Sequence, residues 1–259
     1  MNIAVITGAS SGLGVEYLKH ICEMYPTIQQ YWIVARRKER LEALVKGYPD
    51  KKIVPISLDL QDYKSYDVFD KLLKENDANI KIFVNNAGYG VLGNVHESDY
   101  IGQAGMVDLN CRALTALTGI ALKYMQEGSF IVNVCSIASF CPNARMTVYS
   151  STKAYVRSFS RGIRFENRKR GINCLAVCPG PMETEFLSVA GISGGKSKTF
   201  ETLPYCKPSK VAKKSLIYAE KGRAIYTPTA FYKFYRVLAK LAPHGILMHF
   251  SKPRSNLLR

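Results

Sequence analysis

Short apolar runs rich in Val and Ile alternate along the chain with longer stretches in which apolar residues recur at helical spacing. The short runs predict strands at 3–7, 31–35, 53–58, 81–85, 130–135, 172–178 and 224–226. The longer stretches predict helices near 12–25, 38–47, 64–76, 98–126, 147–169, 208–221 and 229–242, with a break allowed in the fourth. This order is typical of repeated βαβ units, so the sequence predicts an α/β fold, a doubly wound parallel sheet, in a single domain of residues 1–259.

One segment, residues 181–207, departs from this alternation. It contains three glycines among apolar residues, which are Met182, Phe186, Leu187, Val189, Ile192, Phe200 and Tyr205. Connections of this length are usually functional lids or disordered segments. Because the apolar side chains need cover, we predict a substrate lid at 181–207.

The formal net charge of +16 is informative because of where the basic residues lie along the chain. Residues 191–259 carry 14 Lys and Arg against Glu201 and Glu220, so the basic charge is a property of the C-terminal quarter. Nucleic acid is not an expected partner, because no recognised binding motif accompanies the charge.

Residues 228–259 are predicted to form a basic helical extension. Its apolar residues at helical spacing are Phe231, Phe234, Tyr235, Leu238, Leu241 and Ala242, and Lys233, Arg236 and Lys240 fall on the other side. One interpretation is a helix that docks its aromatic face on the domain or on a partner subunit. The other is peripheral contact with an anionic membrane or an acidic substrate carrier.

Size and cysteine content set further bounds. The chain has 259 residues, 47% of them hydrophobic, which suits one large globular domain. No apolar run approaches the roughly 18 to 20 residues that span a bilayer, and no signal-peptide pattern opens the sequence, so we expect a cytoplasmic protein. The seven cysteines lack metal-ligand spacing and are expected to be reduced, with no metal site.

The first predicted strand runs directly into a glycine-rich turn and then a helix. The turn comprises Gly8, Ala9, Ser10, Ser11, Gly12, Leu13 and Gly14. Without Cβ atoms the backbone can approach a pyrophosphate closely, and the N–H groups at the start of the helix favour its negative charge. The position of the turn in a βα unit favours a dinucleotide site over a tight turn alone.

Two arginines, Arg36 and Arg37, follow the second predicted strand, where dinucleotide folds usually place a carboxylate for the ribose 2′-hydroxyl. Guanidinium groups bind a 2′-phosphate instead. The sequence therefore predicts NADP(H) rather than NAD(H) as the cofactor. A solvated charge cluster at the start of a helix is the alternative.

Tyr149 and Lys153 stand four residues apart in the predicted helix 147–169, so their side chains share one face. An ammonium beside a phenol makes the phenolic proton easier to remove. Ser136 ends the preceding strand, which places a hydroxyl within the same layer of the fold. Together they outline a proton-transfer site.

These residues together resemble the short-chain dehydrogenase/reductase family, whose fold is the Rossmann type. The resemblance runs from Asn2 to about Thr184 and depends on the glycine turn, Asn85-Asn86-Ala87-Gly88, Asn110, Ser136, Tyr149, Lys153 and Pro179-Gly180 in this order. It implies Tyr149 as the general acid/base and Lys153 as the group that lowers the Tyr149 pKa and binds the nicotinamide ribose. It implies that Ser136 holds the substrate oxygen and that Asn110 supports a water relay to Lys153.

The resemblance also implies the cofactor contacts. They are Gly8, Ser10, Ser11, Gly12, Leu13, Gly14, Arg36, Arg37, Asp59, Leu60, Asn86, Ala87, Gly88, Tyr149, Lys153, Pro179, Gly180 and Thr184. Arg36 matches the basic position of NADP-preferring members better than Arg37 does. Cys135 departs from the serine that many members carry, and we expect it to point into the sheet without catalytic effect.

The sequence therefore predicts an NADP(H)-dependent oxidoreductase that transfers a hydride to or from a carbonyl or secondary alcohol. The apolar lid and the aromatic last helix favour a lipophilic substrate, and the resemblance favours a hydroxysteroid, with a 3-oxoacyl thioester as the alternative. A non-catalytic NADP(H)-binding sensor or scaffold at membranes is the rival from another class. The resemblance further implies a homodimer or homotetramer.

Overall fold

A seven-stranded parallel sheet forms the centre of the molecule in the computed structural model, which describes residues 1–191 and 203–251. Its spatial order is β3-β2-β1-β4-β5-β6-β7. The strands are β1 (Asn2–Thr7), β2 (Gln30–Ala35), β3 (Ile53–Ser57), β4 (Asn79–Asn85), β5 (Phe130–Val134), β6 (Asn173–Val177) and β7 (Ile225–Tyr226). The predicted α/β class and the doubly wound parallel sheet are confirmed, with strand ends shifted by one or two residues.

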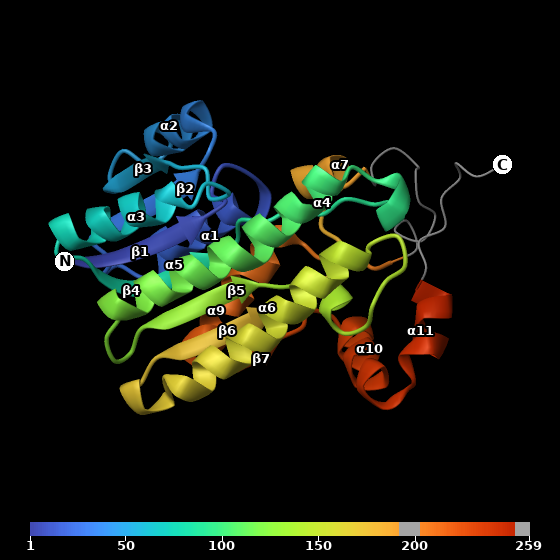
Figure 1. Cartoon of the computed structure of the whole chain (residues 1–259). Coiled ribbons are helices and arrows are strands. Elements are labelled where there is room, and N and C mark those ends of the chain that lie inside the picture. Colours follow the sequence, from blue (N-terminus) through green and yellow to red (C-terminus); the bar gives the residue numbers. More distant parts are fainter. Residues whose placement is uncertain (192–202, 252–259) are drawn as a thin grey trace.

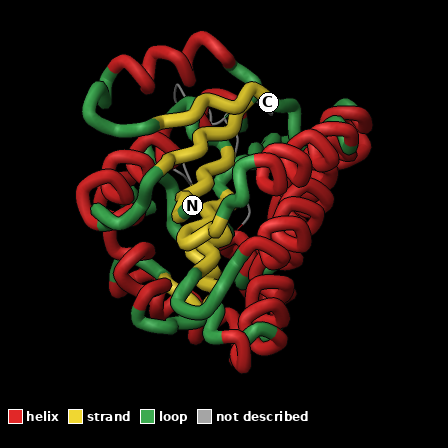
Figure 2. The backbone as a smooth tube through the Cα atoms, turned by 90° about the vertical axis from the view of Figure 1, so that its left-hand side faces the viewer, coloured by secondary structure: helices red, strands yellow, loops and turns green. Residues whose placement is uncertain are grey.

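Helices cover both faces of this sheet, which gives three layers (Figures 1 and 2). Side chains of α1 (Gly12–Met24), α2 (Lys38–Lys46) and α9 (Pro208–Glu220) belong to the core on one face. Those of α3 (Lys64–Glu75) and α5 (Leu114–Ala121) belong to the core on the other, and α6 (Thr147–Glu166) packs beside them.

The alternation along β1 shows why the sequence folds into these layers. Ala4 and Ile6 join the first core, whereas Ile3 and Val5 join the second, and all four are fully buried. Successive side chains of a strand point to opposite faces, so a continuous apolar run is required when both faces are covered.

The long helical stretch predicted at 98–126 is divided into α4 (Tyr100–Val107), a π-helical segment at Asp108–Ala113, α5 and a 3₁₀ turn at Leu122–Tyr124. Further 3₁₀ turns lie at Val95–Glu97, Ile137–Ser139 and Arg168–Arg170. The π-helical segment contains Asn110, and such single-turn irregularities occur frequently at functional sites.

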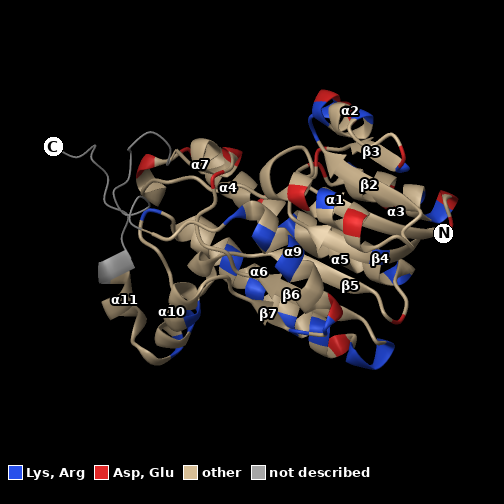
Figure 3. Ribbon diagram, turned by 180° about the vertical axis from the view of Figure 1, so that it is seen from behind, with Lys and Arg blue, Asp and Glu red and all other residues tan. Residues whose placement is uncertain are grey.

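Two helices were not predicted. Helix α7 (Glu185–Val189) lies inside the predicted lid, and α11 (His244–Ser251) follows α10 (Ala230–Leu241) in the C-terminal extension. Residues 192–202 of the lid, including Ile192 and Phe200, and the tail 252–259 lie outside the described residues. Helices α10 and α11 form a lobe beside the carboxyl ends of the strands (Figure 1), and Figure 3 shows Lys and Arg on α9 and α10.

The predicted helix 229–242 divides its apolar residues between two sides. Tyr232 and Ala239 are buried against the domain, whereas Phe231, Phe234 and Leu241 are exposed. The aromatic face therefore docks on the domain only in part, and its docking on a partner subunit stays a prediction. Among the described residues, every helix is too short or too polar to cross a membrane.

Candidate functional site

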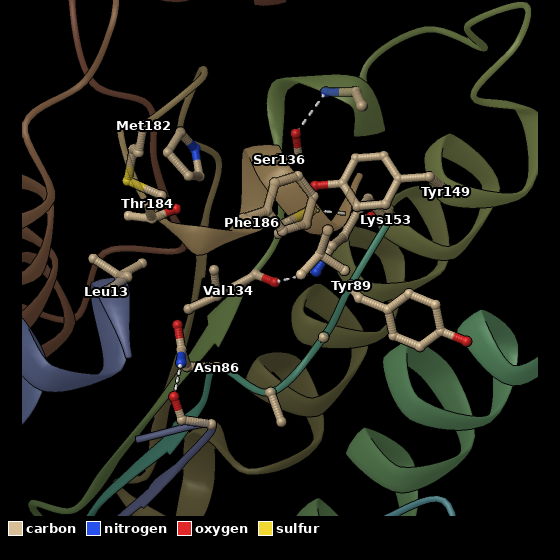
Figure 4. Close-up of a pocket in the computed structure, with 18 of the residues that line it drawn as sticks. Leu13, Asn86, Tyr89, Val134, Ser136, Tyr149, Lys153, Met182, Thr184 and Phe186 are labelled. Atoms are coloured by element: carbon tan, nitrogen blue, oxygen red, sulfur yellow. Dashed lines mark hydrogen bonds between the residues drawn. The ribbon is translucent and has the colours of Figure 1, made fainter. Parts of the chain in front are cut away.

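A cavity of about 920 Å³ opens at the carboxyl ends of the strands (Figure 4). Its walls come from the turn after β1, the start of α2, the turn after β4, the end of β5, α6, the loop after β6, α7, α10 and α11. The strand register explains this convergence, because Ile6 pairs with Val84, Asn85 with Asn133 and Val134 with Val177. Ligands of open parallel sheets bind at this edge.

The glycine turn after β1 is held against the turn after β4. Gly8 has a φ of +65°, and a Cβ there would lie 2.8 Å from the Cα of Ala87, so only glycine fits. The Asn86 amide donates to the backbone oxygens of Thr7 at 3.1 Å and Gly8 at 3.0 Å. The Thr7 hydroxyl accepts the backbone N–H groups of Asn86 and Ala87 at 3.0 and 3.1 Å.

The amino end of α1 opens into the cavity. Ser11 is the N-cap residue, and its side chain does not cap the helix. Ser10, Ser11, Gly12 and Leu13 all line the cavity. The N–H groups at a helix start and the closely approaching backbone suit a pyrophosphate, so the residues present fit a dinucleotide here. Gly14 does not line the cavity; it packs under the turn, against the Gly8 oxygen.

The two arginines after β2 have different surroundings. Arg37 donates to the hydroxyls of Ser10 and Ser11 at 3.0 Å and to the Glu185 carboxylate at 2.9 Å. Arg36 is exposed, lines the cavity, and forms no ion pair with another described residue. Of the two guanidinium groups, that of Arg36 is thus the less engaged by other described residues, and its contact with a 2′-phosphate stays a prediction.

Glu185 stands at the start of α7 and binds both Arg37 and Arg40. Hydrogen bonds from Arg40 and Arg37 lower the pKa of this carboxyl to about 2. Its negative charge therefore borders the phosphate end of the cavity at any ordinary pH. Glu185 was not among the residues predicted from the sequence, where its only signal is an acidic residue in a predicted lid that also lies after two arginines.

Tyr149, Ser136 and Lys153 lie together in the middle of the cavity (Figure 4). Tyr149 and Lys153 come from the first turns of α6, and Ser136 follows β5. All three are buried. The Lys153 ammonium lies 5.8 Å from the centre of the Tyr149 ring and donates to the backbone oxygen of Val134 at 2.9 Å.

Burial is the main influence on the pKa values of Tyr149 and Lys153 when no cofactor is bound. It raises the pKa of the Tyr149 phenol above its ordinary value, and hydrogen bonding with Ser136 only partly opposes the effect. Burial also lowers the pKa of Lys153. Without a cofactor the Tyr149 pKa is therefore raised, because desolvation outweighs the hydrogen bond with Ser136. A lowered Tyr149 pKa beside a bound oxidised nicotinamide stays a prediction.

Asn110 lies behind this group and does not line the cavity. Its amide oxygen accepts the backbone N–H of Tyr89 at 3.1 Å, and its nitrogen donates to the Tyr89 oxygen and to the Thr152 hydroxyl. A Cβ on Gly88 would lie 2.8 Å from that amide oxygen and 3.5 Å from the Lys153 ammonium. Gly88 thus lies between the Asn110 amide and the Lys153 ammonium, where a larger residue would not fit.

Cys135 lies between the sheet and α6. Its thiol donates to the backbone oxygen of Lys153 at 3.0 Å and is 2% exposed. It belongs to the buried cluster that includes Ala176 of β6 and Val156 of α6, and its lack of a catalytic effect stays a prediction. All seven cysteines are free thiols, and six of them are buried.

The remaining residues predicted from the resemblance are also brought to the cavity. Those in its wall are Asp59, Leu60, Ala87, Pro179, Gly180 and Thr184. Residues of the wall that the sequence analysis did not single out include Gln61, Tyr89, Asn143, Met146, Leu203 and Leu247. Most are apolar or amide residues outside any motif, so nothing in the sequence indicates that they line a site.

The part of the cavity beyond Tyr149 is apolar. Its wall contains Ile137, Ala138, Met146, Phe186, Leu187, Val189, Phe231, Tyr235, Leu238 and Leu247. The Phe186 ring stands 5.5 Å from the Tyr149 ring, centre to centre. Helices α7, α10 and α11 thus supply an apolar enclosure next to the proton-transfer group.

Comparison with known proteins gives a consistent result. Residues 2–191 match the short chain dehydrogenase family. Sulfoacetaldehyde reductase 2 of Chromohalobacter salexigens is 29% identical over 207 residues, which are 78% of this chain and 80% of that protein. The short-chain dehydrogenase of Sphingobium yanoikuyae in complex with NADPH superposes with a TM-score of 0.81 at 27% identity, over 95% of both chains. The bulky-bulky ketone specific alcohol dehydrogenase of Comamonas testosteroni superposes with a TM-score of 0.75 at 28% sequence identity. The match covers 95% of this chain and 94% of that protein.

Proposed function

Because the chain belongs to the short-chain dehydrogenase family, we propose that it transfers a hydride between NADP(H) and a carbonyl or secondary alcohol of a lipophilic substrate. The observation that best supports this proposal is that one cavity joins three parts. A glycine turn suited to phosphate lies at one end, Ser136, Tyr149 and Lys153 lie in the middle, and an apolar enclosure lies at the other end. A similar structure, that of the Sphingobium yanoikuyae protein, holds NADPH.

In this proposal the glycine turn, the start of α1 and Arg36 hold the phosphates, and Lys153 binds the nicotinamide ribose. The nicotinamide supplies or accepts the hydride. Ser136 donates a hydrogen bond to the substrate oxygen, and Tyr149 gives that oxygen its proton during reduction or removes it during oxidation. Asn110 holds the Tyr89 backbone next to Gly88, and in this proposal it supports a relay of water and backbone groups to Lys153.

The apolar enclosure supports a bulky lipophilic substrate. Among the described residues of its wall beyond Tyr149, none carries a charge, so a small anion such as a sulfonate would lack a counter-ion. The similar Comamonas testosteroni protein is a bulky-bulky ketone specific alcohol dehydrogenase. We favour a hydroxysteroid as the substrate, with a 3-oxoacyl thioester as the alternative, because fused rings and acyl chains both suit such walls.

We also propose that residues 181–207 act as the lid of this site and that the protein forms a homodimer or homotetramer. Apolar side chains on the outer layer support the second point: Tyr100, Ile101 and Val107 on α4, and Tyr155 and Phe165 on α6, are exposed. Light scattering coupled to gel filtration measures the assembly directly.

A screen of NADPH consumption tests the proposed function. It compares ketosteroids, 3-oxoacyl thioesters, bulky ketones, small ketones and sulfoacetaldehyde under one condition. We expect turnover on at least one of the first three classes and little on the last two. Turnover confined to sulfoacetaldehyde or small ketones contradicts the lipophilic substrate, and tight NADPH binding without any turnover favours the rival sensor or scaffold at membranes.

A further inference from the structure

The outer surface of α10 carries an apolar stripe that the fold leaves uncovered. Its members are Phe231 (51% exposed), Phe234 (68%), Val237 (52%), Leu238 (38%) and Leu241 (77%). Positions 231, 234, 238 and 241 follow the spacing of one helical face. We call these five residues the α10 face. Contiguous exposed apolar surface of this kind marks interaction sites on soluble proteins.

The opposite side of α10 already fixes the helix to the domain. Tyr232 is fully buried, and its hydroxyl donates to the Pro204 oxygen at 2.8 Å. The Tyr235 ring stands 6.4 Å from the Phe140 ring, and Ala239 is buried. The α10 face therefore has no part in holding the helix in place, and its exposure is not explained by docking on the domain.

Basic residues flank the α10 face along one side. Lys233, Arg236 and Lys240 occupy the arc of the helix between its buried side and the α10 face. The sequence from 221 to 259 contains no Asp or Glu. The described helices α10 and α11 therefore carry no acidic residue of their own to compensate this charge, which fits an anionic partner.

The α10 face also borders the cavity. Phe231 and Leu238 belong both to the stripe and to the cavity wall, and Leu247 of α11 continues that wall. On α11, Ile246 is 57% exposed and adds to the outer apolar surface. A lipophilic molecule held at this surface would need to pass only these side chains to reach the cavity.

We propose that the α10 face docks on an anionic membrane surface. The apolar stripe enters the headgroup region, and the exposed Lys233 and Lys240 meet the lipid phosphates, as in other amphipathic helices that lie in the membrane interface. Arg236 is half-buried and donates to the Thr227 hydroxyl at 3.4 Å, so it contributes its charge from behind them. A second copy of the chain fits less well, because a two-fold contact sets each patch against itself and brings the basic arcs together. An acidic carrier protein would match the basic arc but leave the stripe exposed.

Flotation of the full-length protein with vesicles tests this proposal without turnover. Vesicles of phosphatidylcholine alone are compared with vesicles of phosphatidylcholine and phosphatidylglycerol. We expect binding to the anionic vesicles and a partial loss at high salt. Lys233→Glu with Lys240→Glu should weaken that binding by about tenfold or more, since each basic residue near an anionic surface contributes about a fivefold factor. Phe234→Ser with Leu241→Ser should abolish it.

Matched controls lie at the other end of the molecule. Lys123→Glu with Lys169→Glu makes the same charge change, and Val68→Ser removes an apolar side chain that is 45% exposed on α3. Both should bind vesicles as the wild type does. NADPH fluorescence checks that every variant is folded, because the substituted residues lie outside the proposed cofactor contacts.

Three outcomes would overturn the proposal. In the first, the wild-type protein does not bind the anionic vesicles. In the second, the control variants lose as much binding as the α10 variants. In the third, Phe234→Ser with Leu241→Ser reduces the oligomeric state and leaves vesicle binding unchanged, which would show that a second copy covers the α10 face. Failure of the substrate screen leaves these results unaffected, so the two proposals are tested separately.

Discussion

The guanidinium of Arg37 lies 2.9 Å from the carboxylate of Glu185, and so it joins the start of α2 to the start of α7 across the phosphate end of the cavity. Arg40 binds the same carboxylate. A carboxylate beside the site proposed for a 2′-phosphate repels that phosphate and competes with it for the arginines. In the proposed complex, α7 would therefore be coupled electrostatically to cofactor binding.

Replacing this carboxylate should tighten NADPH binding. Glu185→Gln removes one negative charge and leaves the side-chain volume, and we expect an NADPH dissociation constant lower by up to about fivefold, in the range of an exposed ion pair. NADH binding should change little because NADH lacks the 2′-phosphate. Fluorescence titration measures both. Weaker NADPH binding in this variant would mean that Glu185 positions Arg37 and does not compete with the phosphate.

Cofactor selection should depend on Arg36. The Arg36→Asp variant loses a charge-assisted contact, which should weaken NADPH binding by about 1.5 to 3 kcal/mol, while NADH binding is retained. Arg161→Asp is a suitable control, since Arg161 is exposed on α6 and does not line the cavity. If Arg36→Asp keeps its preference for NADPH, the assignment of Arg36 is wrong.

The pH dependence of turnover should follow the raised pKa of Tyr149. Carbonyl reduction needs the protonated phenol, and a pKa above the ordinary value keeps that form at neutral and mildly alkaline pH. We therefore expect kcat/KM for reduction to be flat from about pH 6 to 9. Alcohol oxidation needs the phenolate and should rise with pH over the same range.

Tyr149→Phe provides the control for this profile. It should abolish turnover in both directions and leave NADPH binding nearly unchanged, because the ring is retained. A reduction rate in the wild type that already falls between about pH 7 and 8 would show that the Lys153 charge, and not burial, determines the protonation of Tyr149 in the complex.

Much of this site was predictable because its parts depend on local chemistry. The glycine turn needs a positive φ at Gly8, and the Tyr149 and Lys153 spacing needs only a helix, so both can be read from short stretches. Arg36 and Arg37 were predicted together, but only the structure shows that Arg37 is bound by Ser10, Ser11 and Glu185.

The parts that were not predicted depend on contacts between distant segments. Helix α7 has five residues, too few to display a helical period, and α11 is apolar on nearly every side. One apolar side of α10 is buried and the other is exposed because only one side faces the domain. The spacing of apolar residues along the helix does not show which side that is. The direction of the Tyr149 pKa depends on burial, which no motif reports.

Cys135 should contribute to stability through its hydrogen bond to the Lys153 backbone. Cys135→Ser keeps a donor of similar size and should change the free energy of unfolding by less than about 1 kcal/mol, whereas Cys135→Ala should cost about 1 to 2 kcal/mol. Denaturant unfolding measures both. Equal effects of the two substitutions would indicate that the thiol contributes by packing and not by its hydrogen bond.

Gly180 and Tyr232 should prove strongly coupled, because a Cβ on Gly180 would overlap the Tyr232 ring. That ring is fully buried and anchors α10. Gly180→Ala should therefore lower the free energy of unfolding by about 1 to 3 kcal/mol, as overpacking does, and should increase hydrogen exchange in α10. Lipophilic substrates should bind more weakly because α10 forms part of their enclosure.

Tyr232→Ala removes the obstructing ring and serves as the second arm of a double-mutant cycle. We expect the double variant to be more stable than the sum of the two single effects predicts, since the added methyl group then has space. Gly162→Ala is the matched control: no atom lies within 4 Å of a Cβ built there, in the exposed part of α6, so it should be neutral or slightly stabilising. Additive effects of Gly180→Ala and Tyr232→Ala would contradict the direct contact and remove the link between the cavity and the position of α10.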